Sequence, residues 1–225
     1  MSESAAEPPT KTDERPLVIA IDGPSGAGKS TVGRAVAERL ALDYLDTGAM
    51  YRGVTYAVLR RGLDPMDEDD VAHVASVVEL SMADDGVVVV DGLDATIEIR
   101  GREVTSAVSA VSANGAVREE LVRRQREWVA DRGGGVVEGR DIGSVVFPDA
   151  GLKLYVTATP RVRAMRRVAD IGGEVDDVEA SIIARDQKDS SRAHSPLTET
   201  DDAVVVDTTD LSIDEVVDVI LGMLP

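Results

Sequence analysis

The stretch IDGPSGAGKST, residues 21–31, decides the fold. Within it Gly23, Gly28, Lys29 and Ser30 have the spacing G-x-x-x-x-G-K-[ST] of a phosphate-binding loop. In such a loop the backbone N–H groups converge on a phosphate, and the helix that follows adds positive potential from its N-terminus. The spacing therefore predicts a site for a phosphorylated ligand between a strand and a helix.

The segments on either side of this stretch supply the context that the motif needs. The apolar run PLVIAID (16–22) is short, continuous and followed by a glycine, which predicts a buried parallel strand. A helix is expected from Lys29, with Val32, Val36 and Leu40 at four-residue spacing on its inner face. A glycine-rich turn without chemical meaning is the weaker interpretation in this context.

The loop also predicts how a nucleoside triphosphate would bind. Lys29 is expected to bridge the β- and γ-phosphates, and the Ser30 hydroxyl to help hold Mg²⁺ with ATP. The sequence leaves open whether ATP is preferred over GTP. The residues expected to contact the triphosphate are Gly23, Pro24, Ser25, Gly26, Ala27, Gly28, Lys29, Ser30 and Thr31.

Switches, motors and kinases share such a loop, so other motifs must separate these classes. A GTPase also needs an Asn-Lys-x-Asp motif to read guanine, and the sequence holds none. A motor ATPase needs an apolar strand that ends in a catalytic acid pair, and more chain for partner domains; neither is found. A small-molecule kinase becomes the leading class.

The composition limits the size of the domain, the redox environment and the kinds of partner that the chain can have. The chain has 225 residues, 43% of them hydrophobic, which is enough for one substantial domain with a smaller insert. It has no cysteine, which excludes disulfides and thiolate catalysis and fits a reducing cytoplasm. A net charge of −18 argues against a nucleic acid polymer or an anionic membrane as the main partner.

The most polar and the most apolar segments of the chain indicate where order and membrane contact are expected. Residues 1–16 are polar, acidic and proline-bearing, and we expect a disordered leader. No segment approaches the roughly 20 apolar residues that cross a bilayer. We therefore expect a soluble protein. The low aromatic content, 3%, gives no sign of a large hydrophobic interface, which favours a monomer.

The order of the remaining segments predicts an α/β fold with a parallel sheet. Strands and helices alternate along most of the chain, and this pattern implies right-handed crossovers. Helices are expected from Asn114, as an N-cap residue, and from Ser212, and Val117, Leu121, Trp128 and Val129 form the inner face of the first. Further strands are expected at 44–48, 136–141, 152–158 and 203–207, and further helices at 49–61 and within 161–192.

The middle of the chain has a different hydrophobic pattern from the rest. VVVVDGLDATIEIRG (87–101) alternates around an Asp-Gly turn, which predicts an antiparallel hairpin. We therefore expect residues 67–108 to form an inserted subdomain within a core of residues 17–66 and 109–225.

Arginines gather where a parallel sheet collects its ligands, at strand ends and helix starts. A kinase that phosphorylates a phosphate needs such cations, and the planar guanidinium suits phosphate oxygens. For the run from Arg185 to Arg192 a salt-bridged helix surface is the open alternative. The candidates are Arg52, Arg140, Arg163, Arg166, Arg167, Arg185 and Arg192.

A resemblance that covers nearly all of the chain from Leu17 onward rests on five motifs: IDGPSGAGKST, LDTGAMYR, VREELVRRQR, EGRDIGSVVFPDA and RDQKDSSR. In order and separation they resemble the motifs of bacterial cytidylate kinases, which are P-loop nucleoside monophosphate kinases. The resemblance implies a three-layer α/β fold with a parallel five-stranded core sheet, a small antiparallel CMP-binding insert and a helical lid at about 161–192.

The same resemblance implies transfer of the ATP γ-phosphoryl group to CMP or dCMP, and it assigns residues to that reaction. Those it places at the acceptor are Thr47, Tyr51 and Arg52 (ribose-phosphate), Arg140 (phosphate), Ser109, Arg118 and Asp141 (cytosine), and Arg185 and Asp189 (sugar). Arg163 and Arg167 are expected near ATP. The set expected to act on the transferring phosphates is Lys29, Arg140, Arg185, Lys188 and Arg192. Glu138 departs from the family, which often has aspartate there.

The chemistry of these residue types agrees with the assignment. Cytosine offers an amino donor to Asp141 and acceptors to Arg118, whereas uracil would leave both groups unpaired, so UMP should be a poor substrate. No general base is required, because the attacking oxygen belongs to a phosphate that is already anionic. His73 and His194 are assigned to structure or surface.

Two other functions remain open from sequence alone. One is a kinase for a different small acceptor, such as UMP, dTMP or a cofactor precursor. The other is a regulatory module that binds ATP without turnover, which would not need the second, arginine-rich site. The preference between CMP and dCMP is also open.

Overall fold

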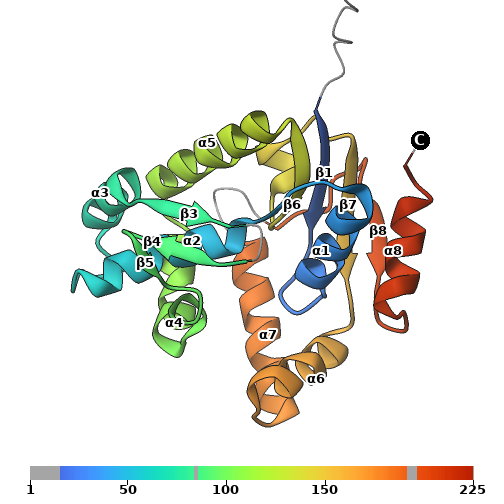
Figure 1. Cartoon of the computed structure of the whole chain (residues 1–225). Coiled ribbons are helices and arrows are strands. Elements are labelled where there is room, and N and C mark those ends of the chain that lie inside the picture. Colours follow the sequence, from blue (N-terminus) through green and yellow to red (C-terminus); the bar gives the residue numbers. More distant parts are fainter. Residues whose placement is uncertain (1–15, 84–85, 192–196, 225) are drawn as a thin grey trace, which may run out of the picture.

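The computed structural model describes residues 16–83, 86–191 and 197–224, so the predicted leader lies almost wholly outside the described residues. Its core is a sheet of five parallel strands in the order β2-β6-β1-β7-β8, which confirms the predicted fold class (Figure 1). The strands are β1 (Leu17–Asp22), β2 (Tyr44–Asp46), β6 (Gly134–Glu138), β7 (Leu152–Thr157) and β8 (Val204–Asp207).

The central strand β1 separates two hydrophobic layers because its side chains alternate between the faces of the sheet. Ile19 and Ile21 pack against α1 (Lys29–Leu40) and α8 (Ile213–Leu221) on one face. Val18 and Ala20 belong to the opposite cluster, which holds residues of α2 (Thr47–Arg60) and α5 (Gly115–Arg132). The result is the predicted three-layer arrangement of helices, sheet and helices.

Local capping explains where several helices begin. The Asp46 side chain accepts a hydrogen bond from Ala49 N at the start of α2, and Asn114 accepts from Ala116 N and Val117 N at the start of α5. Ser212 and Glu215 form a reciprocal capping box at α8. The expected N-cap Asn114 and the expected helix from Ser212 are therefore confirmed.

Two of the three consecutive glycines at 133–135, Gly134 and Gly135, are the first residues of β6. A Cβ on Gly134 would lie 2.6 Å from the Leu17 carbonyl oxygen, and one on Gly135 would lie 2.8 Å from the Trp128 ring. Both glycines also have positive φ, 140° and 155°. Close packing of β1 and α5 therefore requires glycine there, and the strand begins two residues earlier than predicted.

The insert holds a second, antiparallel sheet in the order β3-β4-β5, with strands β3 (Leu80–Met82), β4 (Val88–Val90) and β5 (Leu93–Asp94). The expected hairpin is present, but its second arm is only two residues long. After β5 the chain turns into the 3-10 helix η1 (Glu98–Arg100), which buries Ile99 completely. Sequence alternation did not predict β3, α3 (Glu68–Val77) or α4 (Arg102–Val111).

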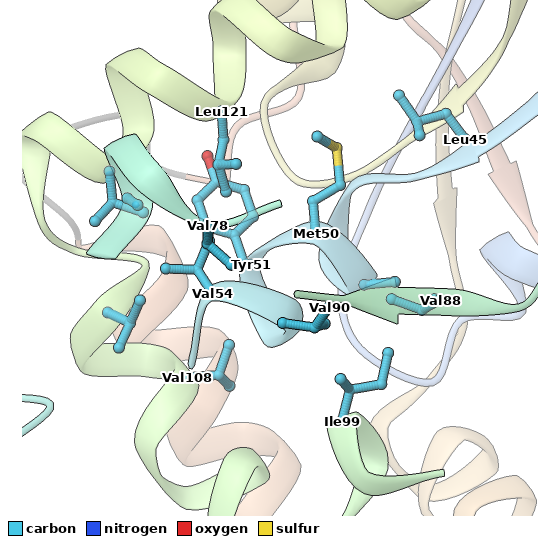
Figure 2. Packing of buried hydrophobic residues seen from close by; sticks show 14 of the residues in the cluster. Leu45, Met50, Tyr51, Val54, Val78, Val88, Val90, Ile99, Val108 and Leu121 are labelled. Atoms are coloured by element: carbon cyan, nitrogen blue, oxygen red, sulfur yellow. The ribbon is translucent and has the colours of Figure 1, made fainter. Parts of the chain in front are cut away.

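The insert shares one hydrophobic core with the helices of the main sheet. Figure 2 shows Val88, Val90 and Ile99 of the insert packed around Met50 and Val54 of α2. Helix α2 therefore joins the two sheets. The expected boundary at residue 67 falls on the N-cap of α3, whereas the boundary at 108 falls inside α4.

The predicted lid region contains two helices packed against each other, α6 (Pro160–Ile171) and α7 (Val175–Ser190). In Figure 1 they lie at the lower edge of the molecule, below the core sheet and to the right of the insert. Thr159 caps α6 and Pro160 is its first residue, a position where proline costs no hydrogen bond.

Candidate active site

A cavity of about 640 Å³ opens at the carboxyl ends of the core strands, where a parallel sheet collects its ligands. The phosphate-binding loop lines one side of it. Residues that follow β2 and β6, the helices α4 and α5, and the pair α6–α7 complete the wall. The charged side chains in the lining are Lys29, Asp46, Arg52, Arg100, Arg118, Glu138, Arg140, Asp141, Arg166, Arg167, Asp170, Arg185 and Asp189.

The loop between β1 and α1 has the backbone that an anion site needs. Gly28 precedes α1 with φ 91°, and no side chain caps the helix N-terminus. Gly23 passes so close to β7 that a Cβ would lie 2.0 Å from the Val156 carbonyl oxygen. The loop can therefore keep this path only with glycine at position 23, and the N–H groups of α1 point into the cavity for an anion.

Lys29 is almost completely buried, with 7% of its surface exposed. Its ammonium donates to the Pro24 carbonyl oxygen at 2.9 Å. Burial and, after it, the charge of the neighbouring Arg140 lower the pKa of Lys29 to about 7. A phosphate bound in the loop would favour the charged ammonium and reverse this shift.

Glu138, at the end of β6, brings a carboxylate to the same loop. The Ser30 hydroxyl donates to its Oε1 at 2.6 Å, while its Oε2 is buried and has no hydrogen-bond partner in the described structure. Burial raises the pKa of Glu138, and Asp46 adds to the rise. An unpartnered buried carboxylate oxygen beside a hydroxyl is a donor set that fits a hard divalent cation.

That donor set suits Mg²⁺ in particular. Among the described residues no cluster of three or more His, Cys, Asp or Glu side chains could hold a metal alone. Mg²⁺ keeps several waters and takes only one or two protein ligands together with substrate phosphates. Ser30 and Glu138, which lie beside a phosphate-binding loop, fit that pattern of coordination.

Arg118 of α5 and Asp141 after β6 form a buried ion pair that lines the same cavity. The side chain of each is 7% exposed. Arg118 also donates to the Ser112 carbonyl oxygen at 3.4 Å, and its guanidinium lies 5.6 Å from the centre of the Tyr51 ring. The pair presents a fork of donors and a carboxylate side by side.

Arg140 links the loop to the lid helices. Its Nε donates to Asp189 of α7 at 3.0 Å, and its NH1 donates to the Gly23 carbonyl oxygen at 2.9 Å. Asp189 is 1% exposed, and Arg185 lies 4.0 Å from the same carboxylate oxygen. These contacts bring three predicted residues together at one point of the cavity wall.

Arg52 reaches the cavity from α2. It donates to the Ile99 carbonyl oxygen at 3.1 Å and to the Thr105 hydroxyl at 3.0 Å, both from the insert. Burial lowers the pKa of Arg52 to about 10, and the charge of Arg185 contributes next. Clustered cations that disfavour one another are typical of a site for a polyanion.

One arginine of α6, Arg163, contacts the phosphate-binding loop directly. Arg163 donates to the carbonyl oxygens of Ala158 and Ser25 and pairs with Asp186 at 2.6 Å, and it does not line the cavity. Arg166 lines the cavity and donates to Thr208 through both terminal nitrogens. Arg167 also lines it.

The remaining predicted residues divide into three groups. Thr47, Tyr51, Arg52, Arg118, Arg140, Asp141, Arg185 and Asp189 all line the cavity. Ser109 and Lys188 do not, and Ser112, one turn after Ser109, lines it instead. Arg192 lies outside the described residues.

Sequence reasoning missed several functional candidates. Arg100, at the end of η1, enters the cavity and lies 3.9 Å from Asp46. Its signal is weak, because it follows an irregular turn that alternation does not predict. Asp22 lies inside the first motif at the end of β1, a position at which a buried carboxylate could have been singled out.

Comparison with known proteins agrees with this geometry. The cytidylate kinase family model matches residues 19–225. The chain belongs to the cytidylate kinase family. It is 51% identical over 209 residues to a cytidylate kinase of Corynebacterium efficiens, an alignment that covers 89% of this chain and 90% of that protein. It is also 51% identical to a cytidylate kinase of Rhodococcus opacus, with 89% and 91% covered.

These relatives confirm the expected class, a kinase of the nucleoside monophosphate type. Solved structures share the fold with little sequence identity. TT1252 from Thermus thermophilus, 19% identical, superposes with a TM-score of 0.50 over 94% of this chain and 100% of that one. An uncharacterized protein from Eubacterium ventriosum, 10% identical, reaches 0.53 over 92% and 96%. Within the described ranges no helix has the length and apolarity to span a membrane.

Proposed function

We propose that this member of the cytidylate kinase family transfers the γ-phosphoryl group of ATP to CMP or dCMP, giving ADP and CDP or dCDP. The observation that carries the proposal is the buried pair Arg118–Asp141, which lines the same cavity as the phosphate-binding loop. One end of the cavity suits a triphosphate and the other suits a polar ring with adjacent donors and acceptors.

The pair complements cytosine better than uracil. Asp141 accepts a hydrogen bond from the 4-amino group, and Arg118 donates to the ring acceptors N3 and O2. Uracil turns one acceptor into a donor and the amino group into a carbonyl. Buried groups left unpaired in this way cost on the order of 10⁴-fold in discrimination. The Tyr51 ring beside Arg118 limits how the guanidinium can move.

The cations between the two ends bring the donor and acceptor phosphates together. Arg52, Arg140 and Arg185 bind the acceptor phosphate in this proposal, while Lys29 and the loop bind the donor. Asp189 orients Arg140 and Arg185, because its buried carboxylate lies against both guanidinium groups. The chain supplies position and charge, which is most of what phosphoryl transfer requires.

Ser30 and Glu138 would hold the Mg²⁺ that accompanies ATP. When bound, the ion neutralises charge on the β- and γ-phosphates and polarises them. The Ser30 hydroxyl donates a hydrogen bond to Oε1 of Glu138 in this structure, so binding of the ion would either break this hydrogen bond or leave it beside the ion.

Other predicted residues keep their proposed roles. Lys188 and Arg192 are proposed phosphate contacts from the lid, Arg163 and Arg167 are proposed ATP contacts, and Ser109 is a proposed base contact. We also propose a monomer that works in the cytoplasm.

The test is ADP release with ATP and Mg²⁺ in the presence of CMP, dCMP, UMP, dTMP or AMP, one at a time. Turnover with CMP and dCMP far above the others is expected. Preference for another monophosphate would retain the kinase and overturn the base assignment. No turnover with any acceptor, while ATP still binds, would favour an ATP-binding module.

A further inference from the structure

The residue that faces cytosine in the proposed function, Asp141, stands at the start of an unusual turn. Residues Ile142–Val146 form a π-helical turn, η2, whose N-cap position is Asp141. Val145 N and Val146 N both donate to the Asp141 carbonyl oxygen, at 2.9 and 3.2 Å. Where Asp141 points therefore depends on how this turn is held.

Aspartate at an N-cap position normally caps its own helix with its side chain. Asp141 does not, because its carboxylate pairs with Arg118 instead. Asp22, at the end of β1, takes over the capping: Ile142 N donates to its Oδ1 at 2.8 Å and Gly143 N to its Oδ2 at 2.7 Å. Asp22 is 6% exposed, so its carboxylate meets these two N–H groups away from water.

The other end of the turn is held from α5. Arg126 donates through Nε to the Val146 carbonyl oxygen and through NH2 to the Val145 carbonyl oxygen, both at 2.9 Å. Arg118, two turns earlier on the same helix, binds the Asp141 carboxylate. Helix α5 therefore fixes both the side chain of Asp141 and the far end of the turn that carries its backbone.

We propose that Asp22 and Arg126 are positioning residues for base selection: together they clamp η2 so that the Asp141 carboxylate is not drawn into capping the turn and, paired with Arg118, keeps facing the base. The inference rests on the proposed function. Without the clamp, the Asp141 side chain competes to cap its own turn and turns away from the base. Neither residue touches the nucleotide in this arrangement, so the clamp acts on selectivity through Asp141.

The test compares kcat/KM for CMP with kcat/KM for UMP in Arg126→Ala, Arg126→Lys and Asp22→Asn. Arg123→Ala is the matched control, because Arg123 lies on the same helix but pairs with Glu120 and Glu127. The CMP-to-UMP ratio should fall roughly tenfold to a hundredfold in Arg126→Ala and Asp22→Asn, the size expected from a misplaced group. In Arg126→Ala the KM for CMP should rise while the KM for ATP stays unchanged.

Arg126→Lys should recover part of the ratio, since an ammonium can still donate to one carbonyl. Arg123→Ala should keep the wild-type ratio. A wild-type ratio in both Arg126→Ala and Asp22→Asn overturns the clamp, and so does an equal loss toward CMP, UMP and ATP, which marks a purely structural role. If Arg126→Ala does not fold, Arg126→Lys and Asp22→Asn decide by the same ratio.

Measurements on the wild type distinguish a failure of the proposed function from a failure of the clamp. Equal wild-type turnover of CMP and UMP contradicts the proposed base reading, whatever the variants do. Amide hydrogen exchange then still reports on the clamp: exchange at Val145–Phe147 should be faster in Arg126→Ala than in Arg123→Ala. Equal exchange in these two variants contradicts the clamp on its own.

Discussion

At the scale of single residues, the site depends on charges that the fold removes from water. Arg118 and Asp141 are nearly inaccessible, and each offsets the cost of burying the other. Such a pair contributes little net stability compared with apolar side chains, but losing one partner is costly. Its retention in a cavity wall agrees with a role in recognition.

Asp141→Ala should lower the free energy of unfolding by about 3–5 kcal/mol, because it leaves Arg118 buried and unpaired. The double variant Arg118→Met/Asp141→Leu should recover much of that loss while remaining inactive toward CMP. Urea denaturation of the two variants and the wild type measures this. A double variant no more stable than Asp141→Ala would show that the pair is not the source of the loss.

Asp22 gives a prediction for stability against pH. Burial raises its pKa from 3.8 to about 6, so the folded protein binds this proton more tightly than the unfolded chain does. The stabilising contribution is complete below pH 4 and is lost as the pH rises through 6. Relative to Asp22→Asn, the wild type should lose up to about 3 kcal/mol of unfolding free energy between pH 4 and 7. Denaturant titrations of both proteins at pH 4 and pH 7 measure these free energies. A difference between wild type and Asp22→Asn that is the same at both pH values would contradict the prediction.

At the scale of elements, the loop after β1 keeps its path because glycine allows close approach. Gly23→Ala would place a Cβ 2.0 Å from a β7 carbonyl oxygen, so it should abolish ATP binding and destabilise the protein. Gly62→Ala is the control: φ is +69° there too, but nothing lies within 4 Å. It should cost about 1 kcal/mol and leave ATP binding intact. Calorimetry with ATP and thermal melts distinguish them; similar behaviour of the two variants would argue against the close-approach explanation.

The same elements show how far the sequence could predict the fold. β1, α1 and the capped helices α5 and α8 follow from apolar runs, the glycine-lysine motif and N-cap residues, which act locally. β3 and the short β5 do not, because three- and two-residue strands are stabilised by tertiary packing around α2 and not by their own alternation.

The candidate site divides in the same way. Lys29, Arg118 and Asp141 were predicted from motifs, and the structure places them around one cavity. The capping of η2 by Asp22 and Arg126 was not predicted, since it joins β1, α5 and the segment after β6 across 120 and 20 residues of sequence. No local pattern reports such contacts.

At the scale of the whole molecule, α6 and α7 are joined to the core through charged contacts. Arg163 reaches the loop at Ser25, and Asp189 holds Arg140. Because both nucleotides would bind among these charges, the lid should tighten when ATP and CMP are present together.

Trypsin cleavage within residues 161–190 should therefore slow with both nucleotides bound. Cleavage at Arg61, at the end of α2 and outside the cavity, is the internal control and should not change. Mass spectrometry of the fragments over time gives both rates. Identical lid cleavage with and without the nucleotides would count against closure.

The central claim is that one buried arginine–aspartate pair, in the same cavity as the phosphate-binding loop, selects cytosine. The most direct measurement is a competition in which the protein receives ATP, Mg²⁺ and equal concentrations of CMP and UMP in one mixture. The initial ratio of CDP to UDP equals the ratio of the two kcat/KM values. The account predicts CDP in excess by a factor on the order of 10⁴. Equal formation of CDP and UDP would contradict it.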